Sequence, residues 1–119
     1  MYKIAIIDDE YNILDMLSTF LEINHDVTTF ENPLEALINL EHNQYDIVLC
    51  DIMMPQMNGL DLLKKLREKG MTTKVMMMTA FDSMDKMLQA HEYGAKHYIK
   101  KPFESLDKVE SKIMQVLEK

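Results

Sequence analysis

The strongest constraint on the fold is a regular alternation of short apolar runs with longer amphipathic segments along the chain. The runs, which we expect to be strands, are Tyr2–Ile7, Asp26–Phe30, Asp46–Cys50, Lys74–Met78 and Lys96–Ile99. The segments that follow them have the 3.6-residue period of helices and cover Tyr11–Ile23, Pro33–His42, Leu60–Lys69, Ser83–Tyr93 and Ser105–Glu118. This order predicts an α/β fold, a doubly wound parallel sheet with helices on both faces and right-handed crossovers.

Residues that start or stop helices support these boundaries. Asn32-Pro33 is typical of a helix start, Ser105 can cap the last helix, and Gly70 and Gly94 fall where helices should end. The sequence of 119 residues contains no linker, repeat or low-complexity tract, so we expect residues 1–119 to form a single domain.

Composition and charge exclude several classes of function. The net charge of −7 argues against a direct nucleic-acid surface, which needs clustered Lys and Arg. No apolar run approaches the roughly 20 residues of a membrane span, and no signal peptide precedes the first run. The single cysteine, Cys50, cannot form an intramolecular disulfide, so a cytoplasmic location is expected.

Methionine and histidine do not indicate a transition-metal site. The chain has twelve Met, but those at 76–78 lie in a strand pattern, and we interpret most as packing residues rather than copper ligands. The four histidines lack metal-site spacing and are expected on solvated faces: His25, His42, His91 and His97.

Polar side chains gather where the expected strands end. They are Asp8 and Asp9 after the first, Asp51 after the third, Thr79 and Ala80 after the fourth, and Lys100 and Lys101 after the fifth. Ligands of open parallel sheets bind beyond the carboxyl ends of the strands, so we expect these residues to converge.

The acids indicate a magnesium site. Asp8 and Asp9 end the stretch KIAIIDDE, and crowded carboxylates at a buried strand end repel one another unless a cation compensates. Carboxylates and water are the ligands that Mg²⁺ prefers, with Mn²⁺ as an alternative. The competing interpretation is that these acids only complement the dipole of the following helix, but this does not explain Asp51.

Asp51 is the best candidate for a nucleophile because it follows the central strand. A carboxylate can attack phosphorus to form an aspartyl phosphate, and phosphoryl transfer needs mainly positioning and cations. Lys101 would supply a point charge for the phosphoryl oxygens, and Thr79 a hydrogen-bond donor.

Four stretches and the helices between them carry a family resemblance: IIDDE, DIVLCDIMMPQMNGLDLLKKLR, VMMMTA and YGAKHYIKKPF. Over essentially its whole length the chain resembles the receiver domain of two-component response regulators. The resemblance implies a flavodoxin-like sheet with strand order 2-1-3-4-5. It also implies that Asp51 accepts a phosphoryl group from a phosphohistidine of a sensor kinase or histidine phosphotransferase.

The resemblance assigns further roles. Asp8, Asp9 and the backbone carbonyl of Met53 would hold Mg²⁺ together with Asp51. Thr79 would be the switch hydroxyl, Tyr98 the switch aromatic residue and Lys101 the phosphate-binding lysine, with a cis Lys101–Pro102 bond. Movement of Thr79 and Tyr98 would change the surface of the fourth helix, fifth strand and fifth helix.

Two positions are expected to set the lifetime of the phosphorylated form. Met53 and Phe81 lie two residues beyond Asp51 and Thr79, and in this family such positions flank the path of an attacking water. Bulky apolar groups at both should slow hydrolysis.

Partner surfaces follow from the same resemblance. Asn12, Ile13, Met16 and Phe103 match the region that docks onto the four-helix phosphohistidine bundle, although Ile13 and Phe103 could equally be core residues. DDEYNI and MTAFDSMD resemble the single-domain phosphorelay regulator of sporulating bacteria. Lys96-His97, in contrast, replaces the acidic pair usual in the winged-helix DNA-binding subfamily.

The sequence therefore predicts a phosphoacceptor switch module rather than an enzyme. A haloacid-dehalogenase-type phosphatase would need an Asp where Met53 stands, and a flavin-binding carrier would need Ser or Thr in place of DDEYN. We expect a monomer without an output domain, whose downstream target is unknown. The alternative is a receiver fragment of a larger transcriptional regulator or hybrid histidine kinase.

Overall fold

The computed structural model describes residues 1–80 and 84–118, which form strands and helices in strict alternation. The strands are β1 Lys3–Ile7, β2 Asp26–Phe30, β3 Ile47–Asp51, β4 Lys74–Thr79 and β5 His97–Lys100. The helices are α1 Tyr11–Leu21, α2 Pro33–His42, α3 Gly59–Glu68, α4 Met84–Glu92 and α5 Leu106–Leu117. The predicted α/β fold is confirmed.

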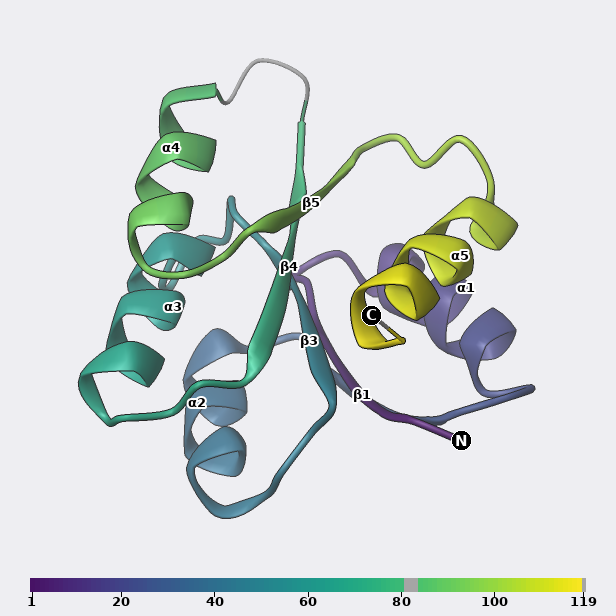
Figure 1. The fold of residues 1–119 in the computed structure, drawn as a ribbon, viewed down its shortest axis with the longest axis horizontal. Coiled ribbons are helices and arrows are strands. Elements are labelled where there is room, and N and C mark those ends of the chain that lie inside the picture. The colour runs from purple at the N-terminus through teal and green to yellow at the C-terminus, as the bar shows by residue number, and fades with distance from the viewer. Residues whose placement is uncertain (81–83, 119) are drawn as a thin grey trace.

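All neighbouring strands pair in parallel, in the order β2-β1-β3-β4-β5, which confirms the flavodoxin-like topology. Figure 1 shows α1 and α5 together on one face of the sheet, and α2, α3 and α4 on the other. The strand order reverses between β1 and β3, so the crevice at the carboxyl ends of these two strands is the expected binding position.

Each face of the sheet has its own hydrophobic core because successive side chains of a strand point to opposite faces. Ile4 and Ile6 of β1 pack toward α1 and α5, whereas Ala5 and Ile7 pack in the cluster formed with α2 and α3. Every residue of β3 is buried, which explains its continuous apolar sequence IVLC.

The predicted helix caps are confirmed. The Asn32 side chain accepts a hydrogen bond from the Leu34 N–H, and the Ser105 hydroxyl accepts one from the Lys108 N–H. Gly70 and Gly94 have φ angles of +80° and +86°, the conformation that glycine adopts readily after a helix. None of the helices within the described ranges is long and apolar enough to span a membrane.

The prediction that all four histidines lie on solvated faces is wrong for His25. This side chain lies in the α1–β2 connection and is buried between α5 and Tyr2, on which its ring stacks. Its Nδ1 accepts a hydrogen bond from the Tyr2 N–H, while Nε2 lies 3.1 Å from Oε2 of Glu110. Burial is tolerated because both ring nitrogens have partners.

Candidate functional site

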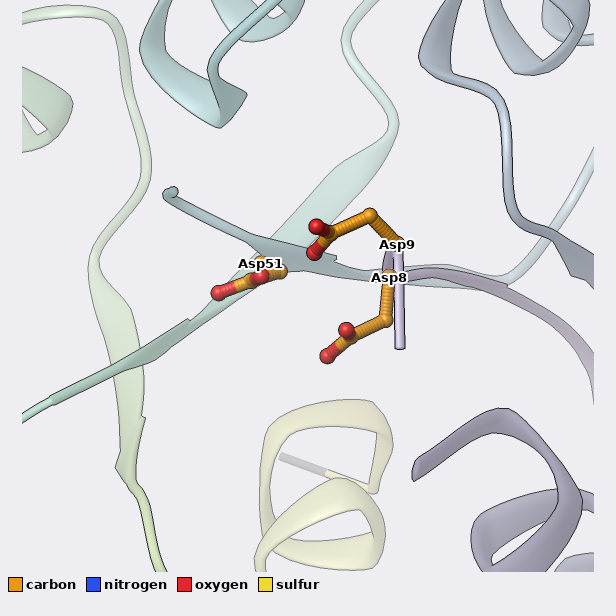
Figure 2. A group of neighbouring side chains, drawn as sticks. All are labelled: Asp8, Asp9 and Asp51. Atoms are coloured by element: carbon orange, nitrogen blue, oxygen red, sulfur yellow. The ribbon is translucent and has the colours of Figure 1, made fainter. Parts of the chain in front are cut away.

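Three carboxylates meet at the ends of neighbouring strands. Asp8 and Asp9 follow β1, and Asp51 is the last residue of the adjacent strand β3. Figure 2 shows the three side chains at this edge, and one carboxylate oxygen from each lies within 4.8 Å of the others. Asp8 is completely buried and Asp51 is 6% exposed, whereas Asp9 is more accessible. The predicted acidic cluster is confirmed.

Lys101 places a positive charge within this acidic cluster. Its Nζ lies 2.5 Å from Oδ2 of Asp8 and 3.4 Å from Oδ1 of Asp51. Its backbone N–H donates to the Thr79 carbonyl at 2.8 Å, which holds the segment after β5 against the end of β4. The Lys101–Pro102 bond is cis, as predicted. A single ammonium group therefore bridges two of the three acids.

The environment changes the pKa of both partners. Burial and, after it, the charge of Asp8 raise the pKa of Asp51 to about 6, against the opposing effects of Lys101 and of a hydrogen bond from the Met53 N–H. Burial acts to lower the pKa of Lys101, but its bonds to Asp8 and Asp51 outweigh this and raise it above the ordinary value. At pH 7 the site thus holds an ionised acceptor next to a charged lysine.

Helix capping accounts for little of this cluster. Oδ1 of Asp8 accepts a hydrogen bond from the Glu10 N–H at 2.9 Å, just before α1. Glu10 occupies the N-cap position without a side-chain capping bond, and the first turn of α1 contains no acid. Asp9 and Asp51 therefore need another explanation. Three carboxylates of this spacing form an oxygen-only donor set that suits a hard divalent cation.

Thr79 and Tyr98 lie on the β4–β5 side of the cluster. Thr79 is the last residue of β4, is buried, and places its hydroxyl oxygen 3.1 Å from the Ala80 carbonyl oxygen. The Tyr98 hydroxyl lies 2.6 Å from the Ala95 carbonyl oxygen and 2.9 Å from that of Met87 in α4, and burial raises the pKa of Tyr98. Tyr98 thus contacts α4 directly, while Thr79 ends the strand beside Asp51.

The structure describes only one of the two residues expected to set the lifetime of the phosphorylated form. Met53 follows β3, its backbone N–H bonds Asp51, and its side chain is 58% exposed. Phe81 lies outside the described residues. The metal-binding role of the Met53 carbonyl stays a prediction.

An apolar groove adjoins the cluster and contains three of the four expected docking residues. Ile13 and Met16 of α1 face Phe103 across a groove of about 330 Å³ that also reaches Lys101. Ile13 and Phe103 are half-buried and Met16 is 38% exposed, whereas the exposed Asn12 does not line the groove. The sequence interpretation missed Pro102 and Leu106 as lining residues, although both flank Phe103 in the stretch KPFESL.

Comparison with known proteins decides the family. The family model described as response regulator receiver domain matches residues 4–113. The chain belongs to this family. Receiver domains are phosphoacceptor signalling modules that partner with histidine kinases, rather than enzymes in the usual sense.

Curated relatives and solved structures agree with the assignment to the receiver-domain family. The chain is 37% identical over 119 residues to the transcriptional regulatory protein CiaR of Streptococcus pneumoniae, covering all of this chain and 53% of that protein. A receiver domain protein (CheY-like) of Methanospirillum hungatei superposes with a TM-score of 0.92 at 29% identity, covering 99% of this chain and 94% of that one. The BeF3-activated DrrB receiver domain gives 0.86 at 29% identity, with coverage of 100% and 99%.

The chain spans about half the length of the curated relatives it matches. Two of these relatives are named transcriptional regulatory proteins, and the expected closer likeness to a sporulation phosphorelay regulator is not shown.

Proposed function

We propose that this receiver accepts a phosphoryl group from a phosphohistidine of a sensor kinase or histidine phosphotransferase onto Asp51, in a magnesium-dependent reaction. The observation that carries the proposal is the meeting of Asp8, Asp9 and Asp51 within 4.8 Å, with the Lys101 ammonium bridging Asp8 and Asp51. Such a site attracts both a divalent cation and the oxygens of a phosphoryl group.

The transfer forms one bond and breaks one. An oxygen of the ionised Asp51 carboxylate attacks phosphorus, and the electron pair of the broken P–N bond returns to the donor imidazole. Lys101 lies close enough to Asp51 to contact a phosphoryl oxygen there as a point charge. The buried Asp8 positions Lys101 through the hydrogen bond between them.

The acids and the Met53 carbonyl would hold Mg²⁺, or Mn²⁺ in its place. A bound cation would neutralise part of the charge that the carboxylates and the phosphoryl oxygens bring together. The donor set fits this role because its ligand atoms are hard oxygens, and the more accessible Asp9 is well placed as a direct ligand.

Phosphorylation would be read out through the surface of α4, β5 and α5. Thr79, at the edge of the site, would move toward the phosphoryl group, and Tyr98 would change its contacts with α4. Output would then pass to a protein partner, or the phosphoryl group would pass on to a second phosphotransferase. We propose residues 1–119 as one receiver domain acting in the cytoplasm, either alone or within a longer regulator.

The test is incubation with acetyl phosphate, with and without Mg²⁺, followed by intact-protein mass measurement. Attack by Asp51 would release acetate and leave one phosphoryl adduct. We expect the adduct only with Mg²⁺, and not in Asp51→Asn.

Asp61→Asn is the matched control because Asp61 is an exposed carboxylate in the first turn of α3. This variant should form the adduct at the wild-type level. An adduct that survives Asp51→Asn, or that forms equally after chelation of Mg²⁺, contradicts the proposal.

A further inference from the structure

The C-terminal ends of α3 and α4 share one cation, Arg67. Arg67 lies in the last turn of α3, and its side chain is half-buried. Its Nε donates to the Tyr93 carbonyl at 2.8 Å, directly after the end of α4, and its Nη1 and Nη2 donate to the carbonyls of Met71 and Thr73 at 2.9 and 3.0 Å. All three guanidinium nitrogens therefore bind backbone.

Within the described residues, the charge of Arg67 is balanced by backbone carbonyls and not by an acid. No carboxylate within residues 1–80 and 84–118 forms an ion pair with Arg67, and burial lowers the pKa of its guanidinium. The compensation comes from the Tyr93 carbonyl directly after α4 and from the Met71 and Thr73 carbonyls in the loop between α3 and β4. Arg67 itself lies in the last turn of α3, where the helix dipole favours a cation. A planar fork with several donors suits such carbonyls better than a lysine ammonium does.

The backbone around Tyr93 leaves room for the Arg67 side chain and is itself held by hydrogen bonds. Gly94 has a φ of +86°, and a Cβ at this position would lie 3.3 Å from Arg67 Nε. The N–H groups of Tyr93 and Ala95 both donate to the Ala90 carbonyl, which closes the end of α4. Ala90 and Ala95 are completely buried. The last turn of α4 is therefore fixed by backbone bonds, by packing and by Arg67.

The other end of α4 connects to the phosphoacceptor site. Only four residues separate Thr79, the last residue of β4, from Met84, the first of α4. A rearrangement at Thr79 would thus reach the N-terminal end of α4 first, whereas the bond from Arg67 to Tyr93 lies at the C-terminal end.

We propose that Arg67 is the fixed anchor about which α4 pivots when the receiver is activated. The inference rests on the proposed function, because it assigns the part of the output surface that stays in place. Arg67 acts here as a positioning residue. Its loss would let the change on activation spread over the whole of α4 instead of being confined to its N-terminal half.

Amide hydrogen exchange of the whole chain, with Mg²⁺ and with or without beryllofluoride as the phosphoryl analogue, tests this. In the wild type, beryllofluoride should change exchange in the first turns of α4 and leave Tyr93, Gly94 and Ala95 within about twofold. In Arg67→Lys these three amides should exchange about tenfold faster before activation, roughly the equivalent of one net hydrogen bond. They should then also respond to beryllofluoride.

Two controls make the outcomes distinct. Lys64→Gln changes an exposed cation on the same helix and should behave as the wild type. Asp51→Asn should abolish every beryllofluoride response. If the wild type shows no response near Asp51, the proposed function fails and the pivot with it. If that response occurs but Tyr93–Ala95 changes as much as the start of α4, or Arg67→Lys behaves as the wild type, the pivot alone is overturned.

Discussion

The carboxylate of Asp51 carries its negative charge at a buried position next to another acid, and both features disfavour that charge. Burial and the neighbouring Asp8 raise its pKa to about 6, and only Lys101 and one backbone N–H act in the opposite direction. The same features make the site useful, since a partly desolvated carboxylate next to a fixed lysine is prepared to meet a cation and a phosphoryl group. The receiver therefore keeps an acceptor that reduces the stability of its metal-free form.

This conflict predicts a pH-dependent effect of Asp51→Asn on stability. The folded-state pKa of Asp51 lies above its ordinary 3.8, so the folded state binds the proton more tightly, and stability falls as pH rises from about 4 to about 6. Without Mg²⁺, Asp51→Asn should raise the free energy of unfolding by about 1–3 kcal/mol above pH 6. The gain should vanish near pH 4. Denaturant unfolding at both pH values measures it, and equal gains at both would contradict this account of Asp51.

The lifetime of the phosphorylated form is a second residue-scale property. Met53 places an exposed apolar side chain two residues beyond Asp51, and Phe81 is expected on the other flank. Replacing both by Asn should speed dephosphorylation about tenfold, a change of about 1.4 kcal/mol in barrier, because water reaches the acyl phosphate more easily. Decay of the adduct after removal of acetyl phosphate gives the rate. An unchanged rate would remove both residues from this role.

At the scale of elements, the loop between β3 and α3 positions the acceptor through close packing. The Gly59 N–H donates to the Ile52 carbonyl at 2.7 Å, and a Cβ on Gly59 would lie 2.3 Å from the Asp51 carbonyl oxygen. Real side chains essentially never approach backbone this closely. Gly59 is thus required because α3 starts against the strand end that carries Asp51.

Gly59→Ala should therefore destabilise the fold by about 2–4 kcal/mol and reduce the phosphorylation rate, since the backbone of Asp51 must shift. Gly70→Ala is the matched control, because Gly70 has a φ of +80° but nothing within 4 Å of a new Cβ. Gly70→Ala should lower the free energy of unfolding by about 1–2 kcal/mol through backbone strain alone, without changing the phosphorylation rate. Chemical unfolding and adduct formation separate the two effects, and equal phosphorylation defects would contradict the packing argument.

The sequence predicts these elements well and their details less well. Alternation and strand-end acids were enough for the sheet and for Asp8, Asp9 and Asp51, since parallel strands bring their carboxyl ends to one edge. Strand ends were less accurate, because Asp51 and Thr79 still pair with neighbouring strands. The burial of His25 and the role of Arg67 were missed, since both depend on partners from distant segments that no local pattern reveals.

At the scale of the whole molecule, the apolar groove and the acidic cluster meet at Lys101. α1 contributes Ile13 and Met16 to one wall, and Phe103 follows Lys101 on the other. Under the proposed function, a partner seated in this groove would lie beside Lys101, whose ammonium group is 3.4 Å from Asp51. Docking and chemistry would then share Lys101, while Met16 would serve docking alone.

Met16→Asp should slow phosphotransfer from a phosphorylated histidine phosphotransferase by about tenfold or more, as removal of an interface anchor does. Phosphorylation by acetyl phosphate should not change, because Met16 lines the groove and does not belong to the acidic cluster. Ile38→Asp is the control, since Ile38 is a 62% exposed apolar residue of α2 away from the groove. Equal effects of both variants on phosphotransfer would rule out the groove as the docking surface.

The most direct test of the central claim is the chemical position of the phosphoryl group. Borohydride converts an aspartyl phosphate to homoserine, and peptide mass spectrometry then locates the converted residue. After treatment with acetyl phosphate and Mg²⁺, we predict homoserine at position 51 and unchanged aspartates at positions 8 and 9. Conversion at either of these positions, or a phosphoryl adduct on another residue type, would contradict the assignment of Asp51 as the acceptor.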